Sequence, residues 1–391
     1  MKSEKAGISA KFRCRFSFLH VKMPRAMTTL VQRGIASSLL GAIALFLAGC
    51  GGGGGGATVP TATPIGTPNG TPTATPIATA TPVPGTGGSP VTANQVAFVS
   101  NRANPSSSSG DLYKSNLDGS NVVRLTSLNQ PLDKPSVSRD GSRLVFQLGE
   151  SNSLGGTNNI EIGIINANGS GFQKLTDDTT VGGRPDDYNP VFAPNDQYIY
   201  WTSTRRAVNE NGLTVDGIPH IWRMSGAIGS TGANQEQFVA EASAFPSVDR
   251  NGNIAYVALN QTTSPIALRT SANILIKRIS DSTPAGQIFD VALSPDGARV
   301  AFSAGTTGTS SSVIRAYDVG TTGRVGGTLS AGASNGGSAW RSDSQTLFFD
   351  AANGAVNRRE VFSSVLPFST TTQVTQDNTS DNYSPAFLPT S

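Results

Sequence analysis

Residues 291–305 read VALSPDGARVAFSAG and contain two short apolar stretches on either side of a Ser-Pro-Asp-Gly turn. Asp296-Gly297 is a strong hairpin signal, because glycine accepts a positive φ without steric cost. Alternate residues of a strand point to the same face, so Val300 and Phe302 present an aliphatic and an aromatic side chain to one packing surface. The segment therefore predicts a β-hairpin with one buried face.

The second strand of this hairpin belongs to a pattern that occurs six times between residues 94 and 391. Each copy ends in an aromatic residue two places after an aliphatic one. The aromatic residues are Phe98, Phe146, Trp201, Tyr256, Phe302 and Phe349, with separations of 48, 55, 55, 46 and 47 residues. A repeat of about fifty residues accommodates four short strands, which is typical of a propeller blade.

A second apolar element precedes most copies, and a turn follows it. Its central residues are Val137, Phe192, Val248, Leu293 and Trp340. The first copy lacks this element, whereas residues 382–387 (NYSPAF) match it and have no copy after them. We therefore expect an all-β domain over residues 94–391, a six-bladed β-propeller whose C-terminal strand completes the first blade. Two separate β-sandwiches are the competing interpretation.

This pattern resembles the TolB-type, WD-like propeller repeat, whose signature is a Pro-x-apolar-Ser-Pro-Asp-Gly strand and turn. Residues 294–297 are the cleanest copy, while Asn195-Asp196 and Asp343-Ser344 depart from it. The resemblance covers about three quarters of the chain and implies the propeller architecture. TolB itself carries an α/β domain before its propeller, and this chain has a Gly/Thr/Pro-rich segment there. The resemblance therefore does not decide membership of a Tol-Pal-type system.

Residues 1–49 have the layout of a secretory signal. A basic region precedes the apolar run LLGAIALFLA at residues 39–48, which is too short for a comfortable membrane span. The run ends at Leu47-Ala48-Gly49-Cys50, which resembles the bacterial lipoprotein signal and implies cleavage before Cys50 and lipidation of that residue. A start at Met23 or Met27 would give a signal of more usual length. A buried N-terminal helix is the alternative interpretation.

Residues 50–93 predict a lipidated cysteine followed by a disordered Gly/Thr/Pro-rich linker. Gly51–Gly56 is a flexible run, and the Thr-Pro repeats after it favour extended chain with few large apolar residues. Lipid chains on Cys50 would hold the protein to a membrane of the bacterial cell envelope. Gly51 stands where lipoproteins retained in the inner membrane carry Asp, which favours the outer membrane, with the domain facing the periplasm or the surface.

Charge and composition exclude several classes of function. Residues 1–49 hold eight of the 29 Lys and Arg and one of the 26 Asp and Glu, so the remainder has a net charge of −4 and is a poor partner for nucleic acid. Two Cys and two His argue against a disulfide framework or a multi-His metal site, and we expect no cofactor and no metal.

One sequence motif and one histidine need a separate interpretation as possible catalytic groups. Residues 332–336 (GASNG) fit the Gly-x-Ser-x-Gly pattern, but they lie in a Gly-rich stretch without the strand-to-helix elbow that exposes a nucleophile. His220 precedes Ile221-Trp222-Arg223, which favours a structural residue at a strand edge over a catalytic base. No catalytic residue is therefore predicted.

Polar residues at the innermost strands are the remaining candidates for a site. If these strands run along the central axis, their carboxylates and phenols gather at one channel mouth, where they could bind a cation or the basic part of a partner. The alternative is that they solvate loops and cap turns. The candidate channel-mouth residues are Asp133, Asp187, Tyr188, Asp290, Asp381 and Tyr383, with Asp186 beside them.

These observations favour a lipid-anchored, extracytoplasmic, monomeric β-propeller that acts as a binding scaffold for an envelope protein or glycan. The alternative is an envelope hydrolase or lyase that acts on polysaccharide or peptide, with two of the channel-mouth carboxylates as acid and base. A purely structural surface protein is a third possibility, and it predicts no saturable ligand.

Overall fold

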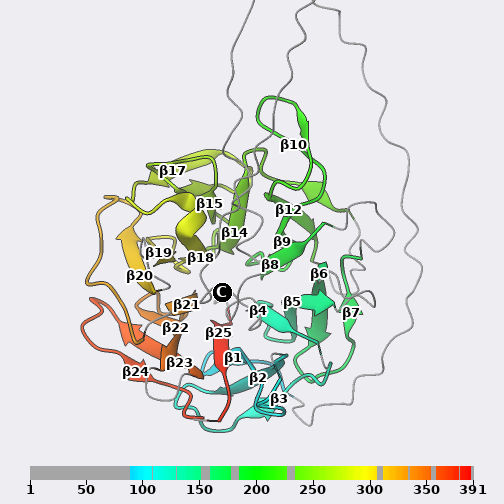
Figure 1. Ribbon diagram of the computed structural model, residues 1–391, viewed down its shortest axis with the longest axis vertical. Helices are drawn as coiled ribbons and strands as arrows, with labels where there is room; N and C mark the ends of the chain where they lie inside the picture. Colours follow the sequence, from blue (N-terminus) through cyan, green and yellow to red (C-terminus); the bar gives the residue numbers. More distant parts are fainter. Residues whose placement is uncertain are drawn as a thin grey trace, which may run out of the picture. The chain divides into compact units, whose positions relative to one another are not determined.

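The computed structural model describes residues 89–107, 109–128, 130–150, 159–177, 185–226, 234–305, 311–332, 335–353, 358–377 and 379–388. The regular structure of these residues is almost entirely β-strand, arranged as six blades around a central axis (Figure 1). The predicted signal, Cys50 and nearly all of the predicted linker lie outside the described residues. The predicted six-bladed β-propeller is confirmed.

Each blade is an antiparallel sheet that begins with its innermost strand. Blade 1 contains β25 (Asn382–Ala386), β1 (Gln95–Ser100), β2 (Asp111–Asn116) and β3 (Val123–Arg124). Blade 2 contains β4 (Leu132–Val137), β5 (Arg143–Glu150), β6 (Asn159–Asn166) and β7 (Gln173–Lys174). Blade 3 contains β8 (Asp187–Phe192), β9 (Tyr198–Ser203), β12 (His220–Ser225) and β13 (Glu236–Gln237), with an added hairpin of β10 (Ala207–Val208) and β11 (Thr214–Val215).

The other three blades complete the ring. Blade 4 contains β14 (Ser243–Val248), β15 (Ile254–Ala258), β16 (Ile266–Arg269) and β17 (Leu275–Ile279). Blade 5 contains a 3-10 turn (Ala285–Gln287), β18 (Ile288–Leu293), β19 (Arg299–Gly305) and β20 (Ser312–Asp318). Blade 6 contains β21 (Asn335–Trp340), β22 (Thr346–Asn353), β23 (Arg358–Val365) and β24 (Thr372–Gln373). In blade 5, two isolated bridges take the place of a described fourth strand.

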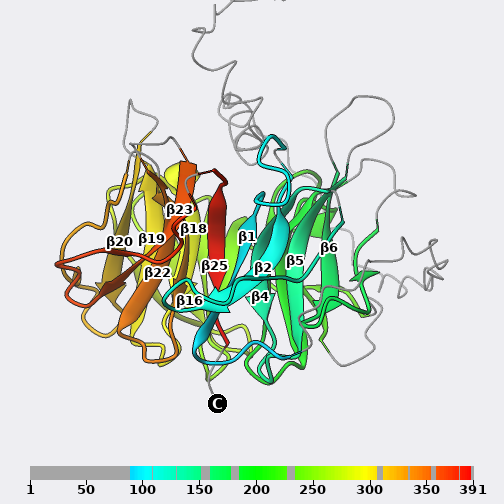
Figure 2. The same cartoon turned by 90° about the horizontal axis from the view of Figure 1, so that it is seen from below.

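The C-terminal strand closes the ring as predicted. β25 pairs antiparallel with β1, with Ala97 opposite Ala386 and Ser100 opposite Asn382, and Figure 2 shows the two strands side by side. The Asn382 side chain accepts a hydrogen bond from Arg102 Nη2 at 2.7 Å and donates one to Glu360 Oε2 at 3.0 Å. Backbone pairing and the Arg102–Asn382 hydrogen bond therefore join the two ends of the propeller sequence, and the Asn382–Glu360 hydrogen bond joins β25 to blade 6.

The repeated aromatic residues form the centres of the blades. All six are fully buried, with no exposed surface. In blades 1, 5 and 6 the ring of this residue stacks on an aromatic residue of the next strand, as Phe349 does on Phe362 with centroids 6.0 Å apart. Burial of one such side chain stabilises the fold by about 2–3 kcal/mol. The repeat observed in the sequence is thus a repeat of core positions.

The turns after the inner strands explain why two copies depart from Asp-Gly. Gly297 has a φ of 71°, and Asp196 and Ser344 at the equivalent positions adopt the same left-handed conformation, with φ of 57° and 54°. The Asp196 carboxylate accepts hydrogen bonds from Arg139 N in blade 2, and Ser344 Oγ accepts one from Asp296 N in blade 5. In these copies the side chain that replaces glycine links its blade to the preceding one.

Candidate functional site in the central channel

The third residue of every inner strand lies at the central axis. An irregularity in strand pairing occurs at this point in the blades, and it redirects the side chain. Lys134, Asn189, Phe245 and Ser384 have φ between 48° and 59° there, a conformation that is rare for residues other than glycine. The sequence positions are equivalent, so the six blades place six different residues, one of them a glycine, in one ring. These residues are Lys134, Asn189, Phe245, Asp290, Gly337 and Ser384.

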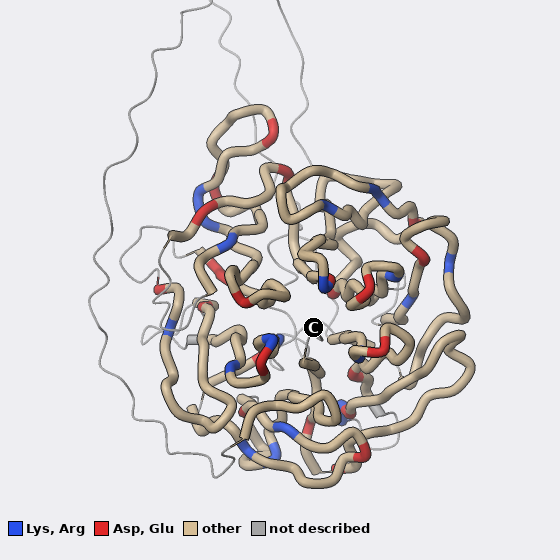
Figure 3. The backbone as a smooth tube through the Cα atoms, turned by 180° about the vertical axis from the view of Figure 1, so that it is seen from behind, with Lys and Arg blue, Asp and Glu red and all other residues tan. Residues whose placement is uncertain are grey.

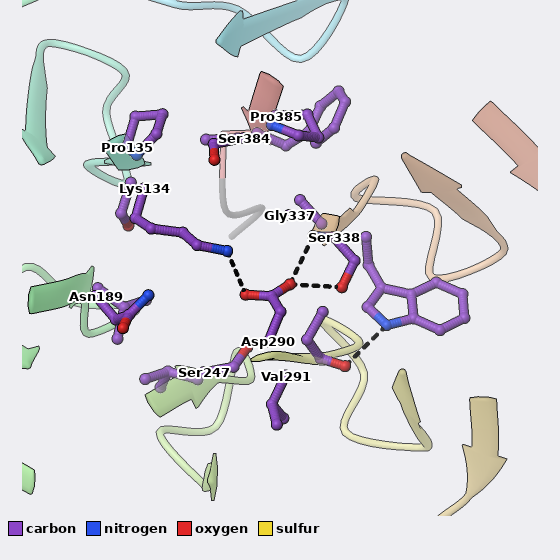
Figure 4. Close-up of a pocket in the computed structure, with 18 of the residues that line it drawn as sticks. Lys134, Pro135, Asn189, Ser247, Asp290, Val291, Gly337, Ser338, Ser384 and Pro385 are labelled. Carbon is purple, nitrogen blue, oxygen red and sulfur yellow. Dashed lines mark hydrogen bonds and ion pairs between the residues drawn. The ribbon is translucent and has the colours of Figure 1, made fainter. Parts of the chain in front are cut away.

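A cavity of about 160 Å³ lies between the six inner strands (Figure 4). The six residues of the ring line it together with residues that follow them on the same strands, including Val291 and Trp340. The Trp340 indole donates a hydrogen bond to Ala292 O at 3.1 Å, which fixes one wall. The cavity has room for a small ligand group, and its walls are both polar and apolar.

An ion pair crosses this cavity between blades 2 and 5. Lys134 Nζ lies 2.8 Å from Asp290 Oδ1, and Asp290 Oδ2 accepts hydrogen bonds from the backbone N and the Oγ of Ser338 at 2.6 and 2.8 Å (Figure 4). The two side chains are 20% and 10% exposed. Blades 2 and 5 are three positions apart in a ring of six, so the pair connects opposite sides of the channel.

A second polar network lies beside this pair. Lys134 N donates to Asp133 Oδ1 at 2.7 Å, and Ser384 Oγ donates to the same oxygen. Ser384 N in turn donates to Asp350 Oδ2 at 3.0 Å, and Asp350 forms an ion pair with Arg359. Four blades therefore contribute to this network, in which the cations Lys134 and Arg359 face the carboxylates Asp133, Asp290 and Asp350.

The structure brings two of the predicted channel-mouth residues to this position. Asp290 lines the cavity, and Asp133 contacts both Lys134 and Ser384 at its edge. Both carboxylates therefore interact with Lys134, one through its backbone nitrogen and the other through its ammonium group.

The remaining predicted residues have partners elsewhere. Asp187 is fully buried, where it forms an ion pair with Arg205 and accepts a hydrogen bond from Trp201 Nε1 at 3.0 Å. Asp381 lies 3.3 Å from Arg358 Nη1 and accepts a hydrogen bond from Arg359 N.

The aromatic candidates and Asp186 are also held by their surroundings. The Tyr188 ring meets the Phe245 ring edge-on, and the Tyr383 hydroxyl donates to Leu132 O at 3.4 Å. Burial raises the pKa of both phenols, and the nearby carboxylates raise it further. Burial also raises the pKa of Asp186, whose Oδ1 accepts a hydrogen bond from Ile160 N. These groups pack around the inner strands rather than line the cavity.

His220 and the described residues of the GASNG motif, Gly332, Asn335 and Gly336, do not line the channel cavity. Residues 333 and 334 of the GASNG motif lie outside the described residues. His220 is the first residue of β12 and is 1% exposed, and its Nδ1 lies 2.8 Å from Ile218 O. Burial lowers the pKa of His220. Among the described residues, no three His, Cys, Asp or Glu side chains are grouped so that they could hold a metal ion.

Sequence reasoning missed Phe245 and Gly337 of the ring and four polar residues of the channel, namely Lys134, Asn189, Ser338 and Ser384. The side chain of Asn189 is aimed at the cavity and has no hydrogen-bond partner among the described residues (Figure 4). A sequence signal does exist for three of the four. Lys134, Asn189 and Ser384 each stand directly before a proline of an inner strand.

Comparison with known proteins identifies the architecture. No family model matches the sequence, and no curated protein sequence matches it either. TolB from Acinetobacter baumannii matches 75% of this chain with 15% identity and a TM-score of 0.55, and the chain spans 66% of that TolB. A chain of a nidogen/laminin complex matches with 9% identity and a TM-score of 0.53, covering 76% of this chain and 99% of its own. Hydrazine synthase from Kuenenia stuttgartiensis matches with 12% identity and a TM-score of 0.52, covering 77% of this chain and 48% of its own. At these identities the likeness establishes the fold, which is a six-bladed β-propeller shared with TolB.

Proposed function

We propose that this protein is a binding scaffold of the bacterial cell envelope, in which the central channel recognises a group on a protein or glycan partner. The observation that supports this most directly is the cavity of about 160 Å³, in which an ion pair and the amide of Asn189 face a common space. Together these groups provide hydrogen-bond donors and acceptors, a positive charge and a negative charge. Such a combination can recognise a polar group of a ligand.

The hydrogen bonding of the acidic residues favours binding over catalysis. A general acid and a general base must both lie within hydrogen-bonding distance of the substrate, and their pKa values must suit proton transfer at the working pH. Asp187 and Asp381 are instead held in ion pairs with arginines, and Asp290 accepts three hydrogen bonds. In this proposal Asp133 and Asp290 contact the ligand. The other four candidate channel-mouth residues hold the inner strands in position.

The anchoring part of the proposal rests on the sequence. We infer that residues 1–49 are a signal peptide, that Cys50 carries lipid, and that residues 50–93 tether the propeller to the membrane, with the outer membrane favoured. In the part of the chain that the structure describes, no helix has the length and apolarity needed to span a bilayer. Lys and Arg are interspersed with Asp and Glu around the propeller (Figure 3), which suits a partner recognised by local contacts rather than by a field of one sign.

In-cell crosslinking with mass spectrometry tests the proposal. Wild type is compared with Lys134→Gln/Asp290→Asn, which replaces the channel ion pair by amides of similar size. The matched control is Arg139→Gln/Glu210→Gln, which removes one charge of each sign from exposed side chains. We expect crosslinks to a protein or glycan that the channel variant loses and the control keeps, with both variants folded by circular dichroism.

The same experiment separates the alternatives. Absence of any captured partner, together with turnover of polysaccharide or peptide that Asp290→Asn abolishes, would identify an enzyme and overturn the scaffold proposal. Equal capture by all three proteins would remove the channel from the binding site. A Cys50→Ser variant that stays in the membrane fraction would contradict the lipid anchor.

A further inference from the structure

A second site lies on the side of the ring, between blades 4 and 5. It is a depression of about 690 Å³, formed by the loop 262–263, residues 280–282, and Arg315, Tyr317 and Arg324 of blade 5. β20 has no continuous outer strand in the described structure, and the segment after it pairs only at Tyr317–Arg324 and Ile314–Leu329. This irregular edge is where the side of blade 5 faces the loops of blade 4.

The centre of the depression is a fixed polar group. Asp281 accepts hydrogen bonds from Arg315 Nη1 at 2.8 Å, Tyr317 Oη at 2.5 Å and Thr283 N at 2.7 Å. Burial opposes ionisation of Asp281, but the hydrogen bonds and the charge of Arg315 outweigh it and lower the pKa of this carboxyl. Burial and the hydrogen bond to Asp281 raise the pKa of Tyr317 to about 12. Arg315 and Asp281 therefore neutralise each other and leave the Tyr317 ring in a defined orientation.

One cation in the depression remains available to a ligand. Arg324 is exposed and makes no ion pair with any carboxylate of the described residues, and its Nη2 donates only to Thr328 Oγ1. The depression therefore has a net charge of +1. A guanidinium group can bind a carboxylate through two parallel hydrogen bonds, a geometry that a lysine ammonium lacks.

The rest of the lining is rich in hydroxyl groups. Thr262, Thr263, Ser280 and Ser282 are exposed around Arg324 and the Tyr317 ring. Hydroxyls both donate and accept hydrogen bonds, so they complement the hydroxyls of a sugar. The volume is within the range of small-ligand sites and exceeds what a single inorganic anion fills.

We propose that this depression binds an acidic saccharide, with a sugar carboxylate at Arg324 and sugar hydroxyls at the Thr and Ser side chains. The proposal specifies a glycan as the partner and so rests on the proposed scaffold function, but it places that glycan away from the channel. An acidic peptide is the competing ligand, because it also carries carboxylates. It should fit less well, since an Asp/Glu peptide lacks the hydroxyl groups of a sugar.

Titration calorimetry of the full-length protein in detergent tests this site with a uronic acid trisaccharide as the probe. Its methyl ester keeps the hydroxyls and loses the charge. We expect saturable binding of the acid, binding of the ester weaker by about tenfold or more, and a similar loss for Arg324→Gln. Arg139→Gln removes an exposed arginine elsewhere and should bind the trisaccharide as wild type does. Thr263→Val should weaken binding by about threefold through loss of one hydroxyl.

Other results of the calorimetry would contradict the site or its assignment to a saccharide. Absence of saturable binding, or equal affinity of wild type and Arg324→Gln, overturns the site. An Asp/Glu peptide that binds as tightly as the trisaccharide overturns its assignment to a saccharide. The channel variant Lys134→Gln/Asp290→Asn is measured in parallel. Loss of trisaccharide binding in that variant, with Arg324→Gln unaffected, moves the glycan to the channel and leaves the scaffold proposal intact.

Discussion

Ionisation of Glu360 should destabilise the closed ring as pH rises. Its carboxylate is fully buried in β23 and accepts hydrogen bonds from Thr375 Oγ1, Asp377 N and Asn382 Nδ2. Asn382 is the first residue of the closing strand β25. Burial raises the pKa of Glu360 from 4.5 to about 7, against the effect of these hydrogen bonds. Protonation of Glu360 is thereby linked to the contact that joins the last strand to blade 6.

The sign and size of the effect follow from this difference in pKa. The pKa of Glu360 is higher in the folded than in the unfolded chain, so the folded protein binds a proton more tightly. The resulting stabilisation is complete below pH 4.5 and is lost as pH rises through about 7. The full difference corresponds to about 3 kcal/mol. Relaxation and water penetration reduce the penalty for a buried charge, so we expect a loss of about 2 kcal/mol between roughly pH 5 and 8.

Urea unfolding of wild type and Glu360→Gln at these two pH values measures the effect. Glutamine does not titrate, so the variant should lack this component of the pH dependence. Burial lowers the pKa of His220, whose stabilising effect rises with pH, but this contribution is common to both proteins and cancels in the difference. The protection of the amides of residues 382–386, taken relative to the intrinsic exchange rate at each pH, should also decrease with pH in wild type alone. Parallel pH profiles for the two proteins, within about 0.5 kcal/mol, would refute the link between Glu360 and closure.

Three further predictions concern packing, the turns and the channel. Phe349→Ala should lower the free energy of unfolding by about 3–5 kcal/mol in urea titrations, because the side chain is fully buried. Ser344→Ala should lower the free energy of unfolding by about 1–2 kcal/mol, because the variant loses the hydrogen bond that Ser344 accepts from Asp296 N. Ser344→Gly loses the same bond but also relieves the strain of the left-handed conformation, so it should be nearly neutral. Thermal melts compare the two variants. Lys134→Met should destabilise the fold by about 2–3 kcal/mol, because it leaves the carboxylate of Asp290 without its cation. Adding Asp290→Asn should restore about half of the lost free energy of unfolding, which a double-mutant cycle measures.

The sequence was sufficient to predict the fold because folding depends on features that occur in every blade. The aliphatic-x-aromatic element specifies a buried strand wherever it occurs, and Asp-Gly specifies a turn by local backbone chemistry. Even the two copies without glycine keep the turn, since Asp196 and Ser344 adopt its left-handed conformation. Closure was also predictable, because residues 382–387 resemble the inner strands of the other blades.

The site was less predictable because its side chains depend on irregularities within the inner strands. In β8 the pairing register shifts between Tyr188 and Val191, so regular alternation does not tell which face a residue occupies. Asp187 consequently lies in the interior of blade 3, with Trp201 and Arg205, and not at the axis. The ion pair of Lys134 with Asp290 joins residues 156 positions apart, a contact that only the assembled ring creates.

In a repeat protein, residues required for folding can be distinguished from residues that serve another purpose by comparing the blades. Features present in all six blades are accounted for by the architecture, so a feature found in one blade needs another explanation. Blade 5 supplies Asp290 to the channel, where blades 1 to 4 have Ser384, Lys134, Asn189 and Phe245. It is also the blade without a described fourth strand. The channel ion pair and the depression around Arg324 thus both involve blade 5, which has no described fourth strand. Variants of blade 5 should therefore separate binding from folding more cleanly than variants of the repeated core.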